Sequence, residues 1–236
     1  AVLVYTSFFV WYAYVAQETG ISLSTLFFER GDAAGYVEMA DSILRGDDSL
    51  VPDNELTRGL RTPGYPLFLS GILSFTREPL VIIMVQIVIA LLTIPFIYSI
   101  CQKLASAPIA FWTTLAYILY PTTAFLNTQI LSETVFMFCT TLSLWLLLAA
   151  PVHWPWRFVA VGATAGIAIL VRPSFLYVVP LMIAYVAVRE RNIWQKVSAG
   201  VAILAATFIL AAPWLHANQR DFGQASLSTA GTFNVL

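Results

Sequence analysis

Seven runs of apolar residues dominate this chain, and each is long enough, or nearly long enough, to cross a lipid bilayer. A transmembrane helix needs roughly 20 mainly apolar residues, because each residue advances the helix by about 1.5 Å. Charged residues make up only 11% of the 236 residues, whereas soluble domains average about 25%. We therefore predict an all-α integral membrane protein with about seven spans: Ala1–Ala16, Pro79–Ile100, Ile109–Leu126, Ile130–Ala150, Phe158–Val171, Phe175–Val188 and Val197–Leu215.

These runs organise the chain as one transmembrane domain in three parts. The parts are a first loop at 17–78, a helical bundle at 79–215 and a tail at 216–236. The chain begins inside an apolar run without an initiator methionine and ends without a stop-like tail, so we expect both ends to be truncated. The first run has neither a basic leader nor a small-residue cleavage site, so we expect no cleavable signal peptide.

Two segments of the first loop predict helices that do not cross the membrane. After Asp32, apolar residues recur at helical spacing, with Glu38 and Asp41 off the apolar stripe. The stripe consists of Val37, Ala40, Ile43 and Leu44. The segment YPLFLSGILSF at 65–75 is apolar but too short to span, which predicts a helix in the membrane interface or packed on the bundle.

Lysine and arginine in the short loops predict the orientation, because cytoplasmic loops carry an excess of both. The loops after the second, fourth and sixth spans carry Lys103, Arg157, Arg189, Arg191 and Lys196. The loop after the third span has no basic residue, and the loop after the fifth has only Arg172. We therefore expect a multi-pass protein of the cell inner (plasma) membrane, with the first loop and its polar residues on the extracytoplasmic face.

Two acidic residues on that face are candidate catalytic residues. Asp32 opens the acid-rich stretch GDAAGYVEMADSILRGD, although an aspartate before a helical run could instead be an N-cap. Glu133 lies about a turn into the fourth run, where an acid costs about 2.5–3.5 kcal/mol and usually faces a cavity. The alternative for Glu133 is a helix N-terminus, with Ser132 as the N-cap and the carboxylate at the positive end of the dipole.

Basic residues on the same face are candidates for binding a phosphate-containing substrate. Arg58 and Arg61 lie in the segment RGLRTPGYP, where proline and glycine fix a turn, and Arg172 lies between two apolar runs in LVRPSF. A guanidinium donates two parallel hydrogen bonds to phosphate, but it can also reach lipid head groups. We take Arg58, Arg61 and Arg172, with Tyr65 of the same motif as Arg61, as candidate substrate-binding residues.

Several other kinds of chemistry have no support in the sequence. The two histidines, His153 and His216, are predicted on opposite sides of the membrane without ligand neighbours, so we expect no metal site. Neither a phosphate loop nor a dinucleotide fingerprint is present, and a net charge of −1 does not indicate a nucleic-acid partner. Cys101 and Cys139 lie at or inside apolar runs, which predicts buried thiols.

The combination of acids and arginines on one face fits group transfer from a phosphate-linked donor. One carboxylate would take a proton from an acceptor hydroxyl, and one or two arginines would neutralise the departing phosphate. We expect no cofactor, because a phosphate-linked donor would itself be a co-substrate.

Five motifs in this order resemble the GT-C superfamily of glycosyltransferases, and most closely its family-39 branch of protein O-mannosyltransferases and lipid A aminoarabinose transferases. The motifs are GDAAGYVEMADSIL, RTPGYPLFLSGIL, ILSETVF, GIAILVRPSF and APWLHANQRDFGQASLSTAGTFN. The resemblance implies a GT-C bundle, a polyprenyl-phosphate sugar as donor and inversion at the anomeric carbon. It also implies that Asp32, on the first outer loop, is the general base.

The chain departs from this family in two ways. Members often carry arginine before the asparagine that follows the seventh span, whereas Ala217 precedes Asn218 here. Members are also longer, so we expect the chain to be either their amino-terminal half or a degenerate copy. A non-catalytic GT-C-like subunit, with protein partners in a larger membrane complex, is therefore an alternative to an enzyme. A transporter of lipid-linked substrates is a second alternative, but it should have ionisable residues near mid-span.

Overall fold

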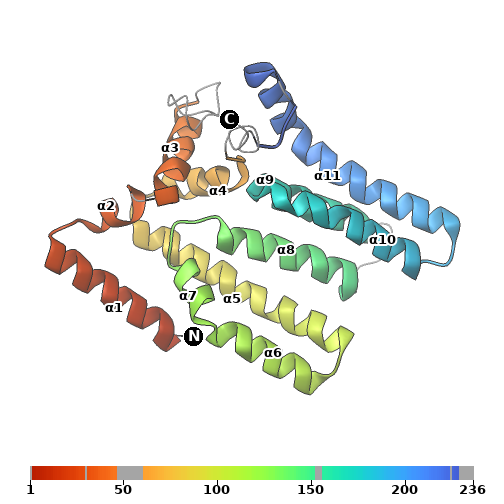
Figure 1. Ribbon diagram of the computed structural model, residues 1–236, viewed down its shortest axis with the longest axis horizontal. Helices are drawn as coiled ribbons and strands as arrows, with labels where there is room; N and C mark the ends of the chain where they lie inside the picture. The colour runs from red at the N-terminus through yellow and green to blue at the C-terminus, as the bar shows by residue number, and fades with distance from the viewer. Residues whose placement is uncertain (1, 30, 47–60, 152–155, 224, 229–236) are drawn as a thin grey trace, which may run out of the picture.

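The structure is a computed structural model, and it describes residues 2–29, 31–46, 61–151, 156–223 and 225–228 (Figure 1). All the regular elements in these ranges are helices, so the protein is an all-α membrane protein, as predicted. The helices are α1 (Val2–Thr19), α2 (Leu23–Phe28), α3 (Gly31–Arg45), α4 (Gly64–Leu73), α5 (Pro79–Leu104), α6 (Ala107–Leu119), α7 (Pro121–Asn127), α8 (Glu133–Leu148), α9 (Trp156–Val171), the 3-10 helix η1 (Pro173–Val178), α10 (Val179–Arg189) and α11 (Ile193–Phe222).

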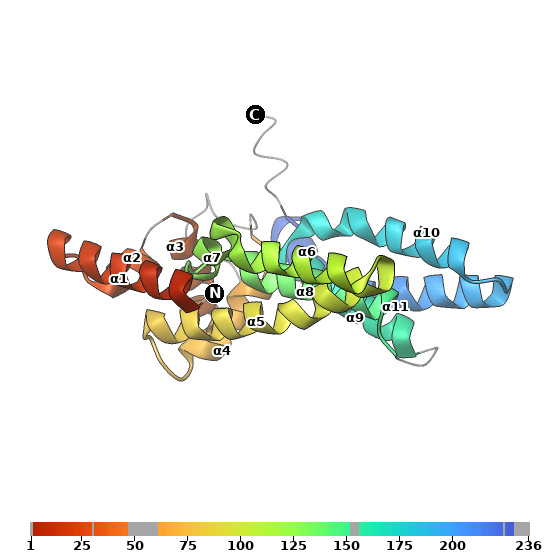
Figure 2. The same ribbon diagram turned by 90° about the horizontal axis from the view of Figure 1, so that it is seen from below.

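The bundle is built around α9, which packs against α8 on one side and α11 on the other. Figure 2 shows a shallow arrangement, with α1 extending from one side of the molecule and the α10–α11 pair from the other. Two glycines allow α9 and α11 to approach closely. A Cβ at Gly162 would collide with the carbonyl oxygen of Ile203, and a Cβ at Gly166 would lie 2.9 Å from the carbonyl oxygen of Thr207. Small residues at such contacts are typical of helix packing in membranes.

Fewer helices than expected have the length of a full membrane span. Among the described residues, α5 and α11 are long and apolar enough to cross a membrane, and α6 with α7 would make a third crossing. The last two meet at a 56° bend, because Pro121 begins a new helix after the extended residue Tyr120. Helix length therefore supports two or three of the seven predicted spans, and α8, α9 and α10 with η1 are apolar but shorter.

The observed helix boundaries differ from those of the predicted spans, for physical reasons that a hydropathy pattern does not reveal. Residues 128–132 are turns and bends before α8, although several of them are apolar. The sixth predicted run begins as the 3-10 helix η1, and α11 extends well past the predicted end at Leu215. The tail predicted from His216 therefore begins as helix. Both thiols are free, with Cys139 buried and Cys101 half-buried.

The helices alternate in direction, so their ends gather at two opposite ends of the bundle (Figure 1). We call the end where α5 and α8 begin and α9 ends the site end. The other, the basic end, is where α5, α8 and α10 end. A pocket of about 270 Å³ at the basic end is lined by Lys103, Arg157 and Arg189, among others.

Helices α3 and α4 form a cap on the site end, and three contacts attach this cap. The hydroxyl of Thr62 donates to the carbonyl oxygen of Val171 at 3.0 Å. A Cβ at Gly64 would lie 2.6 Å from the carbonyl carbon and oxygen of Leu170, so α4 begins in direct contact with the end of α9. Arg77 binds Asp41 through two hydrogen bonds of 2.6 and 3.3 Å, which joins α3 to the segment before α5. The cap is therefore fixed to the bundle beside Arg172.

Candidate active site

The first part of the candidate site is the ion pair between Asp32 and Arg61. Arg61 Nη2 donates to Asp32 Oδ1 at 2.9 Å, and Nη1 donates to the backbone oxygen of Asp32 at 2.9 Å. The guanidinium lies along α3, where a Cβ at position 35 would come within 3.1 Å of Arg61 Nε. Gly35 therefore leaves room for Arg61 to reach Asp32. The Asp32 side chain is 71% exposed, so the carboxylate is open to a substrate.

The second part is the ion pair between Glu133 and Arg172. Arg172 Nη2 donates to Glu133 Oε1 at 2.6 Å, and Nε donates to Ser132 Oγ at 3.0 Å. Glu133 Oε2 is buried and has no hydrogen-bond partner in the described part of the chain. The arginine comes from the extended residue between α9 and η1, and the carboxylate comes from the first turn of α8. A helix N-terminus favours a negative charge, so the site of Glu133 is electrostatically suited to an acid.

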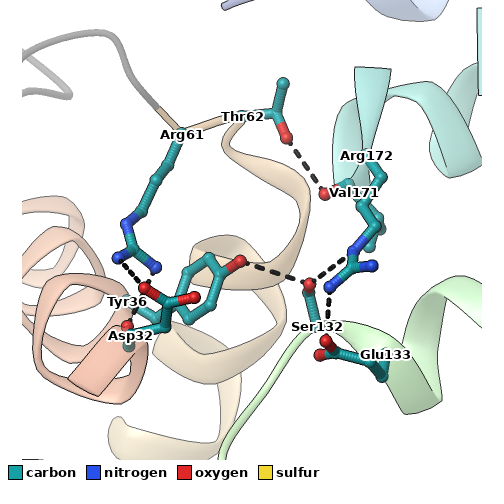
Figure 3. Close-up of polar contacts among 8 residues, drawn as sticks. All are labelled: Asp32, Tyr36, Arg61, Thr62, Ser132, Glu133, Val171 and Arg172. Atoms are coloured by element: carbon teal, nitrogen blue, oxygen red, sulfur yellow. Dashed lines mark hydrogen bonds and ion pairs between the residues drawn. The ribbon is translucent and has the colours of Figure 1, made fainter. Parts of the chain in front are cut away.

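Tyr36 joins the two ion pairs (Figure 3). Its hydroxyl donates to Ser132 Oγ at 3.2 Å, the same oxygen that accepts from Arg172. The Arg61 guanidinium lies over its ring, 4.3 Å from the centroid, at the distance of a cation–π contact. The six polar side chains that carry the candidate chemistry, from Asp32 on α3 to Arg172 after α9, therefore form one connected set.

The structure shows where both acids lie relative to the helix starts that the alternatives invoked. Asp32 lies in the first turn of α3, after Gly31 with φ of 55°, so it is not the residue before the helix. Ser132 occupies the N-cap position of α8, but its side chain makes no capping hydrogen bond. It binds Tyr36 and Arg172 instead. Both residues are at helix starts, as the alternatives required, but their side chains are directed to the site.

Tyr65 does not lie in the site, contrary to the prediction that it binds substrate. It is fully buried, and its hydroxyl donates to Gln86 Oε1 at 2.6 Å. Burial raises the pKa of Tyr65 well above its usual value, which keeps the hydroxyl protonated as a donor. Gln86 in turn donates to the backbone oxygens of Asn127 and Gln129 at 3.3 and 2.6 Å. Tyr65 therefore holds the cap on the bundle and has no surface to offer a substrate.

The remaining predicted residues fall into two groups. Arg58 lies outside the described residues. Asp41 binds Arg77 at the other end of α3, and Glu38 is exposed, so neither belongs to the connected set. Sequence reasoning missed Tyr36 and did not recognise Ser132 as a site residue. Tyr36 follows Asp32 by four positions, which places both on the same face of a helix, and this spacing was the available signal.

The family comparison matches the part of the chain that builds most of this site. A family model described as dolichyl-phosphate-mannose-protein mannosyltransferase matches residues 61–216. The chain belongs to this family. Neither a curated protein nor a solved structure matched. The matched range includes Arg61, Glu133 and Arg172, whereas Asp32 precedes it.

Membership of the family makes the chain a membrane glycosyltransferase of the GT-C type, and it confirms the resemblance predicted from the five motifs. The family uses lipid-linked sugar donors, so membrane lipids are partners of the protein. For such an enzyme, an apolar surface that opens beside the polar site is relevant to how the donor is held.

Two adjacent grooves on the α11 side of the bundle provide an apolar surface. One, of about 580 Å³, lies between η1–α10 and α11 and is lined almost entirely by apolar residues, among them Leu176 and Phe208. The second, of about 260 Å³, shares these two residues and extends to Leu215 and Leu227. Leu176 belongs to η1, the 3-10 helix that follows Arg172.

Proposed function

We propose that this glycosyltransferase moves a sugar from a polyprenyl-phosphate donor to an acceptor hydroxyl on the extracytoplasmic face, with inversion at the anomeric carbon. The observation that carries the proposal is the connected set of two arginine–carboxylate pairs at one end of the bundle. Two cations suit one lipid phosphate, and two carboxylates suit the hydroxyls of a sugar and its acceptor.

Asp32 is the general base in this proposal. Its carboxylate is 71% exposed, and within the described residues only Oδ1 is bound, by Arg61. The acceptor hydroxyl gives its proton to Asp32 while its oxygen forms a bond to the anomeric carbon. The bond between that carbon and the phosphate oxygen breaks at the same time, and the electron pair leaves with the lipid phosphate. A single displacement of this kind inverts the configuration at the anomeric carbon.

Arg172 and Arg61 bind the phosphate as its charge increases. Each guanidinium has five N–H donors, so the ion pairs leave donors for phosphate oxygens. Glu133 has the role of holding Arg172 through Oε1.

The apolar grooves along η1, α10 and α11 support a lipid-linked donor over a soluble one. A polyprenyl chain lying between η1–α10 and α11 would contact Leu176 and Phe208. The cations of the basic end support the extracytoplasmic orientation of the site end, because short cytoplasmic loops carry the excess of lysine and arginine. This would place the donor in the outer leaflet of the inner membrane.

The test is sugar transfer by the full-length protein in membrane vesicles supplied with radiolabelled polyprenyl-phosphate mannose and a set of other polyprenyl-phosphate sugars. We expect labelled acceptor and free polyprenyl phosphate from at least one donor, with none from the matching nucleotide sugars. Digestion of the product with anomer-specific glycosidases should give the configuration opposite to that of the donor. Folded protein that transfers from none of these donors would overturn the proposal in favour of a non-catalytic subunit, and retained configuration would overturn inversion.

A further inference from the structure

Tyr36 occupies the space between the two guanidinium groups that the proposed function assigns to the phosphate. Its ring lies under Arg61, and its hydroxyl shares Ser132 Oγ with Arg172. The ring also makes an edge contact with the buried ring of Tyr65, with centroids 4.8 Å apart. Tyr36 therefore contacts both Arg61 and Tyr65, and its hydroxyl lies beside Ser132 and Arg172 (Figure 3).

The hydrogen bonds at Ser132 leave one hydrogen unused. A serine hydroxyl has one hydrogen and two lone pairs, and Ser132 Oγ accepts from both Arg172 Nε and the Tyr36 hydroxyl. Within the described residues its own hydrogen therefore has no acceptor. Because hydroxyl hydrogens rotate, Ser132 can donate to Tyr36 instead of accepting from it. The contact between the two oxygens is kept, and the Tyr36 hydrogen becomes available to a ligand.

We propose that Tyr36 is a third donor to the lipid phosphate, beside Arg61 and Arg172. When the donor substrate binds, the Tyr36 hydrogen turns from Ser132 to a phosphate oxygen, and Ser132 donates its hydrogen to Tyr36. This inference rests on the proposed function, because it concerns the same phosphate. The hydrogen bond strengthens as the bond between the anomeric carbon and the phosphate oxygen breaks, since the electron pair stays on the phosphate.

A hydrogen bond to a charged group sets the expected size of the effect. In Tyr36→Phe, the loss of this hydrogen bond should slow transfer by roughly 10- to 150-fold. The loss should affect mainly kcat, because the charge on the phosphate is largest in the transition state. Tyr36→Phe keeps the ring beneath Arg61 and removes one oxygen. Tyr120→Phe is the matched control, because its side chain is 58% exposed and lies outside the connected set.

The experiment measures transfer and binding on the same full-length proteins in detergent micelles. The binding probes are farnesyl phosphate and farnesol, which differ only in the phosphate. We expect the unmutated protein and Tyr120→Phe to prefer farnesyl phosphate strongly, and Tyr36→Phe to lose a large part of that preference without a change in farnesol affinity. Ser132→Ala, which removes the hydrogen offered to Tyr36, should reduce the preference in the same direction, and it serves as the test if Tyr36→Phe fails to fold.

Each outcome separates this inference from the proposed function. An unmutated protein that binds farnesyl phosphate no better than farnesol contradicts the proposed function itself. A protein that prefers the phosphate, with Tyr36→Phe equal to it in both preference and kcat, overturns the role of Tyr36 and leaves the function intact. Equal losses of farnesol and farnesyl phosphate affinity in Tyr36→Phe also overturn it, because they assign Tyr36 to packing.

Discussion

Replacing Asp32 by asparagine separates catalysis from folding in this structure. Asparagine keeps the shape of the side chain and an oxygen that can accept from Arg61, but it cannot take a proton from an acceptor hydroxyl at neutral pH. Loss of a general base typically lowers the rate by roughly 10²- to 10⁴-fold. We therefore expect transfer by Asp32→Asn to fall by a factor in this range.

The effect on stability should be much smaller, because Asp32 is 71% exposed and its partner Arg61 is 23% exposed. An ion pair with this much access to solvent contributes about 0–1 kcal/mol, and the asparagine oxygen keeps part of the hydrogen bonding. Against a typical folding stability of about 5–15 kcal/mol, a loss of this size does not change the folded fraction measurably. A large drop in activity therefore cannot be explained by unfolding.

Asp41→Asn is a matched control on the same helix. Asp41 also binds an arginine, Arg77, with its shorter contact at 2.6 Å, but it lies outside the connected set. Both variants should be assayed for transfer from the active polyprenyl-phosphate sugar, with thermal unfolding followed in the same micelles. The control should keep transfer within a few-fold of the unmutated protein.

Two results would refute the reasoning. Near-normal transfer by Asp32→Asn would remove the role of general base and leave only the ion pair with Arg61. An equal loss of transfer activity in Asp32→Asn and Asp41→Asn would mean that the ion pairs act only by holding α3 in place. Neither carboxylate would then take part in the reaction.

Three further predictions follow from packing, charge and topology. Gly64→Ala should destabilise the protein by about 1–3 kcal/mol in thermal or denaturant unfolding, because its Cβ meets the backbone of α9 at 2.6 Å. As a control, the Cβ of Gly71→Ala on the same helix meets nothing within 4 Å, so this variant should stabilise the protein by roughly 0.5–1 kcal/mol. A double-mutant cycle on Glu133→Gln and Arg172→Gln should give a coupling free energy of about 1–2 kcal/mol. This value lies between those of exposed and buried ion pairs, because the two side chains are 26% and 38% exposed. A coupling of zero would show that the pair is not formed. In a variant without native cysteines, a membrane-impermeant thiol reagent added outside should label Gly71→Cys and not Arg191→Cys, and the reverse pattern would contradict the orientation.

Parts of the fold could be predicted because a single physical signal determines them. The run from Pro79 is continuous and uninterrupted, and α5 begins at that residue. The bend before Pro121 was missed because hydropathy does not register a change of direction between two apolar segments. The length of α8 was overestimated for the same reason: the apolar residues before Glu133 form turns.

The candidate site was predicted residue by residue but not as a set of contacts. Four charged residues stand out in this apolar chain, because charged side chains are costly in a membrane and usually have a function. They are Asp32, Arg61, Glu133 and Arg172. Their pairing depends on how α3, α8 and the end of α9 meet, which no local pattern encodes. Tyr65 was misassigned because its motif does not reveal that Gln86, 21 positions later, takes its hydroxyl.

The separation of Glu133 and Arg172 along the chain has a consequence for biosynthesis. The acid is made 39 residues before its partner, and at about 5–20 residues per second the ribosome needs roughly 2–8 s to supply the arginine. During that interval α8 emerges with an unneutralised carboxylate at its edge. Delayed release of α8 until α9 arrives would keep this carboxylate away from lipid. Slowing translation between these positions should accordingly lower the yield of assembled protein, and an Arg172 variant should lower it at any speed.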